Sequence, residues 1–182
     1  MLNEKPLLRL MKDSWKGGYH AAEYNGRFFL RGPGWQIAVQ RQALPRKALA
    51  QMVEHIGVLP EGCSYLTDKK ENAQTEILGA ELEIHEQAAA ELREYSVGIR
   101  PTPLYYQGYH VWQVLGSGET VLLSDPMTAI VDASKVDQVT VSQDRTRIFF
   151  SGAAGYASVG TTILDVYAEA MKHLSAFPWT GA

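Results

Sequence analysis

The chain of 182 residues has 46% hydrophobic and 20% charged side chains and a formal net charge of −3. This composition supports one folded domain of ordinary size and excludes a globally disordered, collagen-like or low-complexity chain. The charge is unevenly divided, because residues 1–50 hold nine basic and three acidic side chains whereas residues 51–100 hold four basic and ten acidic ones. Such asymmetry indicates a polyanionic partner or self-association, unless folding interleaves the two segments.

A β-hairpin is predicted near the N-terminus, in a β-β-β-α unit that spans about residues 18–57. Asn25-Gly26 lies between the runs His20–Tyr24 and Arg27–Arg31. This dipeptide between apolar-rich runs is the strongest local signal for a tight hairpin turn, because both residues tolerate positive φ.

A third strand and a helix complete this unit. Apolar and polar residues alternate over Trp35–Gln40, which predicts a strand with one buried face. Pro45 stands at an expected first helical position, and apolar residues then follow at helical spacing until Gly57. We therefore expect a helix between Pro45 and Gly57.

The acidic middle of the chain is compatible with two local structures. Asp68-Lys69-Lys70-Glu71 has the form of a capping box and predicts the start of an acidic helix. A stripe at helical spacing supports it, formed by Leu78, Leu82, His85, Ala89 and Leu92. The alternative is a short strand over about 76–84 followed by a helix from about 86.

The C-terminal half is predicted to contain two more hairpins. Pro101 and Pro103 mark an expected lobe boundary. Beyond them we expect hairpins over 109–124 and 139–150, a strand over 128–131, a glycine-containing connection over 151–160 and a helix over about 161–176.

The predicted fold class is α+β, with mainly antiparallel β-hairpins packed against about three helices. Gly-Tyr-His occurs at 18–20 and again at 108–110, at the start of two predicted hairpins. The repeat indicates either a duplication into two related hairpin lobes or two hairpins that begin alike independently. We expect a single domain over 1–182, with 1–100 and 101–182 as its sub-lobes.

Recognisable motifs for cofactor, metal or catalytic sites are absent from the sequence. There is no phosphate-binding loop, and Gly116-Ser117-Gly118 lacks the third glycine of a dinucleotide site. The five histidines are scattered, and no serine or cysteine lies in a nucleophile motif. The sequence therefore predicts no cofactor, no metal and no catalytic residue.

The strongest positive signal lies on the predicted second strand. Strand periodicity puts Arg27, Phe29 and Arg31 on one face, and an open aromatic ring between two guanidinium groups could stack on bases and neutralise phosphates. In the alternative, a helix covers this face and Phe29 belongs to the core. The complete basic site predicted for nucleic acid or another partner comprises Lys16, Arg27, Phe29, Arg31, Arg46 and Lys47.

An acidic partner-binding surface is predicted on the middle helix. Its candidate residues are Glu81, Glu83, Glu86 and Glu91. Such a surface could contact a basic partner, or the basic segment of another copy.

The cysteine content and the absence of glycosylation sequons indicate a cellular compartment. The single cysteine, Cys63, forms no intramolecular disulfide, and the chain has no Asn-x-Ser/Thr sequon. Both features favour a reducing compartment, and no apolar run reaches the length of a membrane span. The expectation is a cytoplasmic protein without a membrane partner.

Three functions are compatible with these observations. The first is a non-enzymatic binding or regulatory protein that contacts a protein or nucleoprotein partner, or another copy of itself, through charged surfaces. The second is a nucleic-acid-binding protein that uses the Arg/Phe strand face. The third is a hydrolase or transferase without a recognisable motif, which would require titratable groups converging in a deep pocket.

Overall fold

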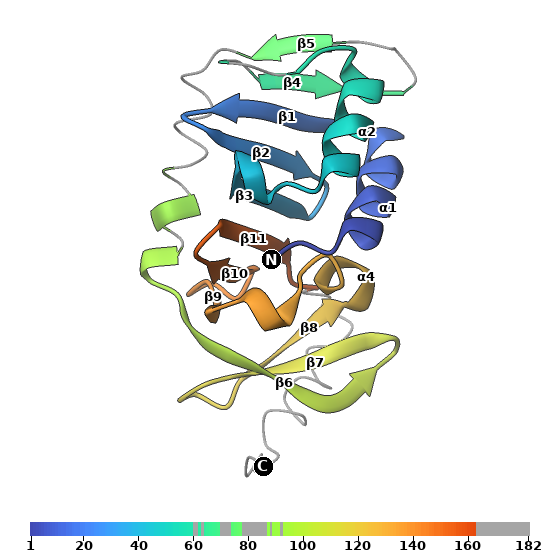
Figure 1. Cartoon of the computed structure of the whole chain (residues 1–182). Coiled ribbons are helices and arrows are strands. Elements are labelled where there is room, and N and C mark those ends of the chain that lie inside the picture. Colours follow the sequence, from blue (N-terminus) through green and yellow to red (C-terminus); the bar gives the residue numbers. More distant parts are fainter. Residues whose placement is uncertain are drawn as a thin grey trace.

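The computed structural model describes residues 1–59, 62, 64–69, 74–77, 87, 89–91 and 93–162. The first half of the described chain (Figure 1) contains α1 (Glu4–Trp15), β1 (Tyr19–Tyr24), β2 (Arg27–Gly32), β3 (Trp35–Gln40), η1 (Arg41–Ala43), α2 (Arg46–Ile56), β4 (Ser64–Thr67) and β5 (Gln74–Ile77). The second half contains β6 (Val97–Tyr106), β7 (Tyr109–Val114), β8 (Thr120–Ser124), α4 (Asp125–Thr128), η2 (Ala133–Lys135), β9 (Gln138–Val141), β10 (Arg147–Gly152) and β11 (Gly155–Gly160).

The strands form one antiparallel sheet in the order β5-β4-β1-β2-β3-β11-β10-β9-β6-β7-β8. Helices and an antiparallel sheet in one chain confirm the predicted α+β class. The two Gly-Tyr-His strands, β1 and β7, lie far apart, because β2, β3, β11, β10, β9 and β6 stand between them.

One face of the sheet carries the larger core. Helices α1 and α2 lie side by side over this face (Figure 1). Their inward residues, among them Leu7, Met11 and Met52, are fully buried with Phe28 and Leu30 of β2. Burial of large apolar side chains removes their surface from water, and this is the main favourable contribution to folding here.

A second, smaller core lies on the opposite face. Strand side chains alternate, so Phe29 points away from α1 and α2. Its cluster contains Ala22, Ala38, Phe149 and Tyr156, together with Ala89 from a helical segment. Around this cluster the sheet is therefore buried on both faces.

The predicted β1–β2 turn and the predicted helix between Pro45 and Gly57 are confirmed. Asn25 and Gly26 form the β1–β2 turn with φ values of 50° and 71°. Helix α2 follows Pro45 and ends at Gly57, whose φ of 83° is the left-handed value that favours glycine at a helix C-terminus.

Two expectations for the first half are corrected, and one helix is missed. Helix α1 is not predicted by the sequence analysis above. Strand β3 is buried on both faces rather than one, because it lies inside the sheet and both of its faces are covered. Residues 74–77 form strand β5 paired to β4, so an acidic helix does not run from Asp68 through this segment.

In the second half, one strand is missed and two expectations are corrected. Strand β6 runs through Pro101 and Pro103, and pairs with β9 only at Val97 and Gly98. A proline is tolerated in a strand where its missing N–H would face no partner strand.

Residues 125–128 form α4, where the sequence predicts a turn followed by a strand over 128–131. Residues 155–160 form β11, where the sequence predicts a connection without regular structure. The predicted helix beyond residue 162 lies outside the described residues.

Helix α2 is joined to the sheet by buried rings. The Tyr19 hydroxyl and His55 Nδ1 share a 2.9 Å hydrogen bond, and the His55 ring stacks on Trp15 with the ring centres 3.9 Å apart. Trp15 Nε1 also donates to Thr67 Oγ1 over 3.1 Å. Burial lowers the pKa of His55, although the nearby Glu54 opposes this effect.

We expect acid to destabilise the fold through His55. The folded-state pKa is below the unfolded value of about 6.5, so the unfolded chain binds the proton more readily. The stabilisation is complete above that pH and declines as the pH falls towards the folded-state pKa, by at most about 1.4 kcal/mol per pH unit.

Urea unfolding at pH 7.5 and 5.5 checks this expectation. His55→Phe retains a ring against Trp15 but cannot titrate, so its unfolding free energy should fall less between the two pH values than that of the wild type. Equal losses in both proteins would show that His55 is not the responsible group.

Candidate functional site

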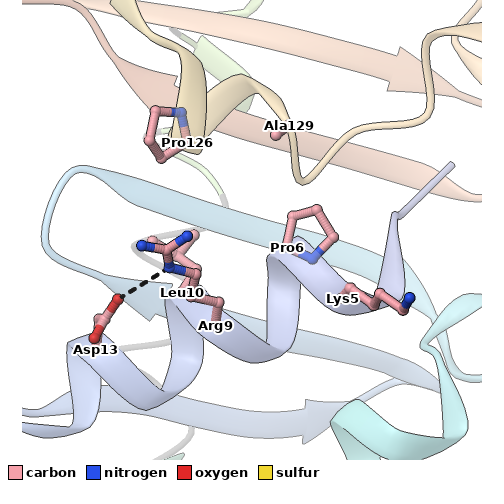
Figure 2. A pocket seen from close by; sticks show the side chains of 7 residues that line it. All are labelled: Lys5, Pro6, Arg9, Leu10, Asp13, Pro126 and Ala129. Atoms are coloured by element: carbon pink, nitrogen blue, oxygen red, sulfur yellow. Dashed lines mark ion pairs between the residues drawn. The ribbon is translucent and has the colours of Figure 1, made fainter.

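A groove of about 500 Å³ lies between α1 and α4. Lys5, Pro6, Arg9, Leu10 and Asp13 line it from α1, and Pro126 and Ala129 line it from the α4 turn. Figure 2 shows Pro6, Arg9 and Leu10 directed from the helix towards that turn. We call this surface the α1–α4 groove.

Hydrogen bonds fix the two walls of the groove against each other. Asn3, which precedes α1, donates from its backbone N–H to the Ile130 carbonyl over 2.8 Å. Its side-chain amide donates to the carbonyls of Ala129 and Val131 over 2.9 and 3.0 Å. A groove held in this way exists before a partner arrives, which lowers the ordering cost of binding.

The α1 wall is apolar at its floor and charged at its rim. Arg9 Nε lies 4.0 Å from an Asp13 carboxylate oxygen (Figure 2), and Lys16 Nζ donates to the other oxygen over 2.9 Å. The hydrogen bond and charge of Lys16 lower the pKa of Asp13, with smaller contributions from Arg9 and Lys12. Cations therefore surround the one carboxylate of the groove.

Basic residues continue from the groove over α1 and α2. Lys5, Lys12 and Arg46 are exposed, and the described part of the chain places no carboxylate within ion-pair distance of them. Lys47 pairs with Glu4 across the two helices at 3.1 Å. The outer surface of the helical layer thus carries a net positive charge.

The six predicted basic-site residues do not form one patch. Lys16, Arg46 and Lys47 lie on the helical layer. Arg27 and Arg31 lie on the strand face that points away from this layer, as the alternation of β2 dictates. The sheet separates the two groups.

Phe29 is not an open stacking platform. Its side chain is only 7% exposed and belongs to the second core. The alternative stated in the sequence analysis describes it correctly, because Ala89 of a helical segment covers this part of the sheet. Arg31 remains exposed and Arg27 half-buried, so the expectation of a ring open between two cations is wrong.

The acidic surface is only partly described. Glu81, Glu83 and Glu86 lie outside the described residues. Glu91 is helical and exposed, and so is Glu94 one turn later. These two carboxylates belong to the segment whose Ala89 packs against the sheet face that carries Phe29.

A second, more polar groove of about 460 Å³ lies beside that segment. Its lining residues are Ala90, Arg93, Glu94, Ser96, Gln138, Thr140 and Ser151. Neither groove is lined by a histidine or cysteine. Within the described ranges no cluster of three metal-ligating side chains occurs, and none of the described helices is long and apolar enough to cross a membrane.

Comparison of the chain with protein-family models, curated proteins and solved structures finds no match. Support for a function must therefore come from the geometry of the chain itself. The α1–α4 groove is the candidate site, because it joins a preformed apolar floor to a charged rim.

The groove residues Lys5, Arg9 and Ala129 are absent from the predicted site. The sequence does contain a signal for Lys5 and Arg9, since Lys5, Arg9, Lys12 and Lys16 recur at spacings of four, three and four residues, the pattern of one helix face. No local signal connects this helix to Pro126 and Ala129, which lie more than a hundred residues away along the chain.

Proposed function

We propose that this protein is a non-enzymatic binding protein that docks an acidic protein segment in the α1–α4 groove. The observation that carries the proposal is the combination of an apolar floor, formed by Pro6, Leu10, Pro126 and Ala129, with the cations Lys5 and Arg9 at its rim. An acidic segment with intervening apolar side chains matches both features.

The apolar floor distinguishes a protein segment from nucleic acid as the preferred ligand. Phosphate contacts require cations and hydrogen-bond donors, and a stacking site requires an open aromatic ring. Apart from the charged Lys5, Arg9 and Asp13, the groove is lined by aliphatic side chains, and none of its lining residues is aromatic. Apolar contact gives affinity at the centre of an interface, and charge complementarity at its rim selects partners and speeds association.

The test is fluorescence anisotropy with a labelled peptide of alternating glutamate and leucine. Lys5→Glu/Arg9→Glu should weaken binding about tenfold or more, because two favourable charge contacts become repulsive. Ala129→Trp should weaken it by filling the groove without changing the charge. Added salt should weaken the wild-type interaction, because it screens the exposed rim.

Matched controls separate the groove from net charge. Lys69→Glu/Lys135→Glu changes the charge equally at two exposed lysines outside the groove, and should bind like the wild type. A glutamine/leucine peptide and a glutamate/serine peptide should each bind more weakly. Unchanged binding by Lys5→Glu/Arg9→Glu would contradict the proposal, as would tighter binding of single-stranded DNA that this variant abolishes.

A further inference from the structure

The basic helical layer and the acidic segment lie on opposite sides of the sheet. Leu7 and Met11 of α1 pack with Phe28 and Leu30, whereas Ala89 packs with Phe29 on the other side. The groove rim of one copy therefore cannot reach Glu91 and Glu94 of the same copy. The sheet keeps the two opposite charges apart instead of neutralising them within the chain.

The acidic segment presents a helical stripe outward. Gln87, Ala90, Glu91 and Glu94 are helical and exposed, at the i, i+3, i+4, i+7 spacing of one face. Ala89 is buried and Arg93 half-buried, and the Arg93 guanidinium lies 4.6 Å from the centre of the buried Tyr156 ring. The inward residues thus anchor the segment to the sheet while the outward ones offer two carboxylates around a small apolar side chain.

This stripe has the chemistry that the α1–α4 groove requires. Glu91 and Glu94 can meet the cations Lys5 and Arg9, and Ala90 can enter the apolar floor between them. The surrounding sequence strengthens the complementarity, because residues 76–94 contain six glutamates and a single arginine.

We infer that the groove of one copy binds the Gln87–Glu94 stripe of a second copy. The inference rests on the proposed function and names the acidic segment as one from this same protein. The two contacting surfaces differ, so the association is head-to-tail. A pair of copies therefore retains one free groove and one free stripe at its two ends, which leads to rings or filaments instead of closed twofold dimers.

Sedimentation velocity of the full chain over a concentration series tests this inference. At low salt the average mass should rise with concentration above the 20.2 kDa of a single chain, and at high salt it should return to that value. Lys5→Glu/Arg9→Glu and Glu91→Lys/Glu94→Lys should each remain monomeric alone, because each variant opposes like charges at the contact.

An equimolar mixture of these two variants should associate again. The reversed groove of the first variant then faces the reversed stripe of the second, and the native groove of the second faces the native stripe of the first. Lys69→Glu/Lys135→Glu, with the same net charge as the first variant, should associate like the wild type. Circular dichroism should show that all three variants remain folded.

Three results would overturn the inference. They are a wild type that remains monomeric at the highest concentration, a charge-reversed variant that still associates, and a mixture that does not regain association. The peptide experiment keeps the two proposals distinguishable. If the glutamate/leucine peptide binds but copies do not associate, the groove still docks acidic segments and only the self-association fails.

Discussion

Replacement of Trp35 by alanine is expected to lower the free energy of unfolding by about 4 kcal/mol, the usual cost of removing a buried Trp side chain. The indole is 1% exposed, and its Nε1 donates to Ser14 Oγ of α1 over 2.8 Å. It faces Gly32 across the β2–β3 hairpin, where a Cβ atom would overlap the ring. Removal therefore leaves a cavity that its cross-strand neighbour cannot fill and a polar group without its partner.

Thermal and urea unfolding measure this effect. For a chain of this length the loss corresponds to a fall of roughly 10 °C in the midpoint temperature. Trp35→Phe retains most of the packing but loses the hydrogen bond, so it should cost about 1–2 kcal/mol. A fall of less than about 1 kcal/mol in Trp35→Ala would show that α1 does not depend on this contact.

Elements of this fold are predictable from the sequence where neighbouring residues specify them, and are missed where they depend on contacts between distant parts of the chain. The β1–β2 hairpin is predicted because Asn25 and Gly26 specify their own turn, whatever surrounds them. Strand β6 is missed because prolines fit a strand only where the missing N–H points to a side without a partner. Beyond Gly98 the β9 side of β6 is such a side, although Pro101 pairs with Trp112 of β7 on the other side, and β9 lies much later in the sequence.

The candidate site is even less predictable from the sequence, because one of its two walls depends on contacts between distant residues. The spacing of Lys5 and Arg9 indicates a helix face, but the second wall of the groove depends on Asn3 bonding to the carbonyls after α4. The distribution of charge along the sequence likewise does not show where the acidic segment lies relative to the basic helix α1. The structure shows this, because Phe29 and Ala89 are buried in one cluster, which places the acidic segment across the sheet from α1.

Phe29→Ala is expected to destabilise the protein by about 3–4 kcal/mol. The ring lies between Ala22 and Ala38 on neighbouring strands, with Ala89 above, so it fills space that these small side chains leave. None of the three alanines can extend into the resulting cavity. Phe29→Leu retains most of the volume and should cost about 1–2 kcal/mol.

Arg31→Ala is the matched control for this strand face, because Arg31 is exposed two residues further along β2 and should change the unfolding free energy by about 0.5 kcal/mol or less. Urea unfolding distinguishes the two roles proposed for Phe29. A core residue costs stability with or without ligand, whereas a stacking residue costs little stability and weakens binding of single-stranded DNA. If Phe29→Ala were as stable as the wild type, the ring would not be buried and the nucleic-acid face would return as the leading candidate.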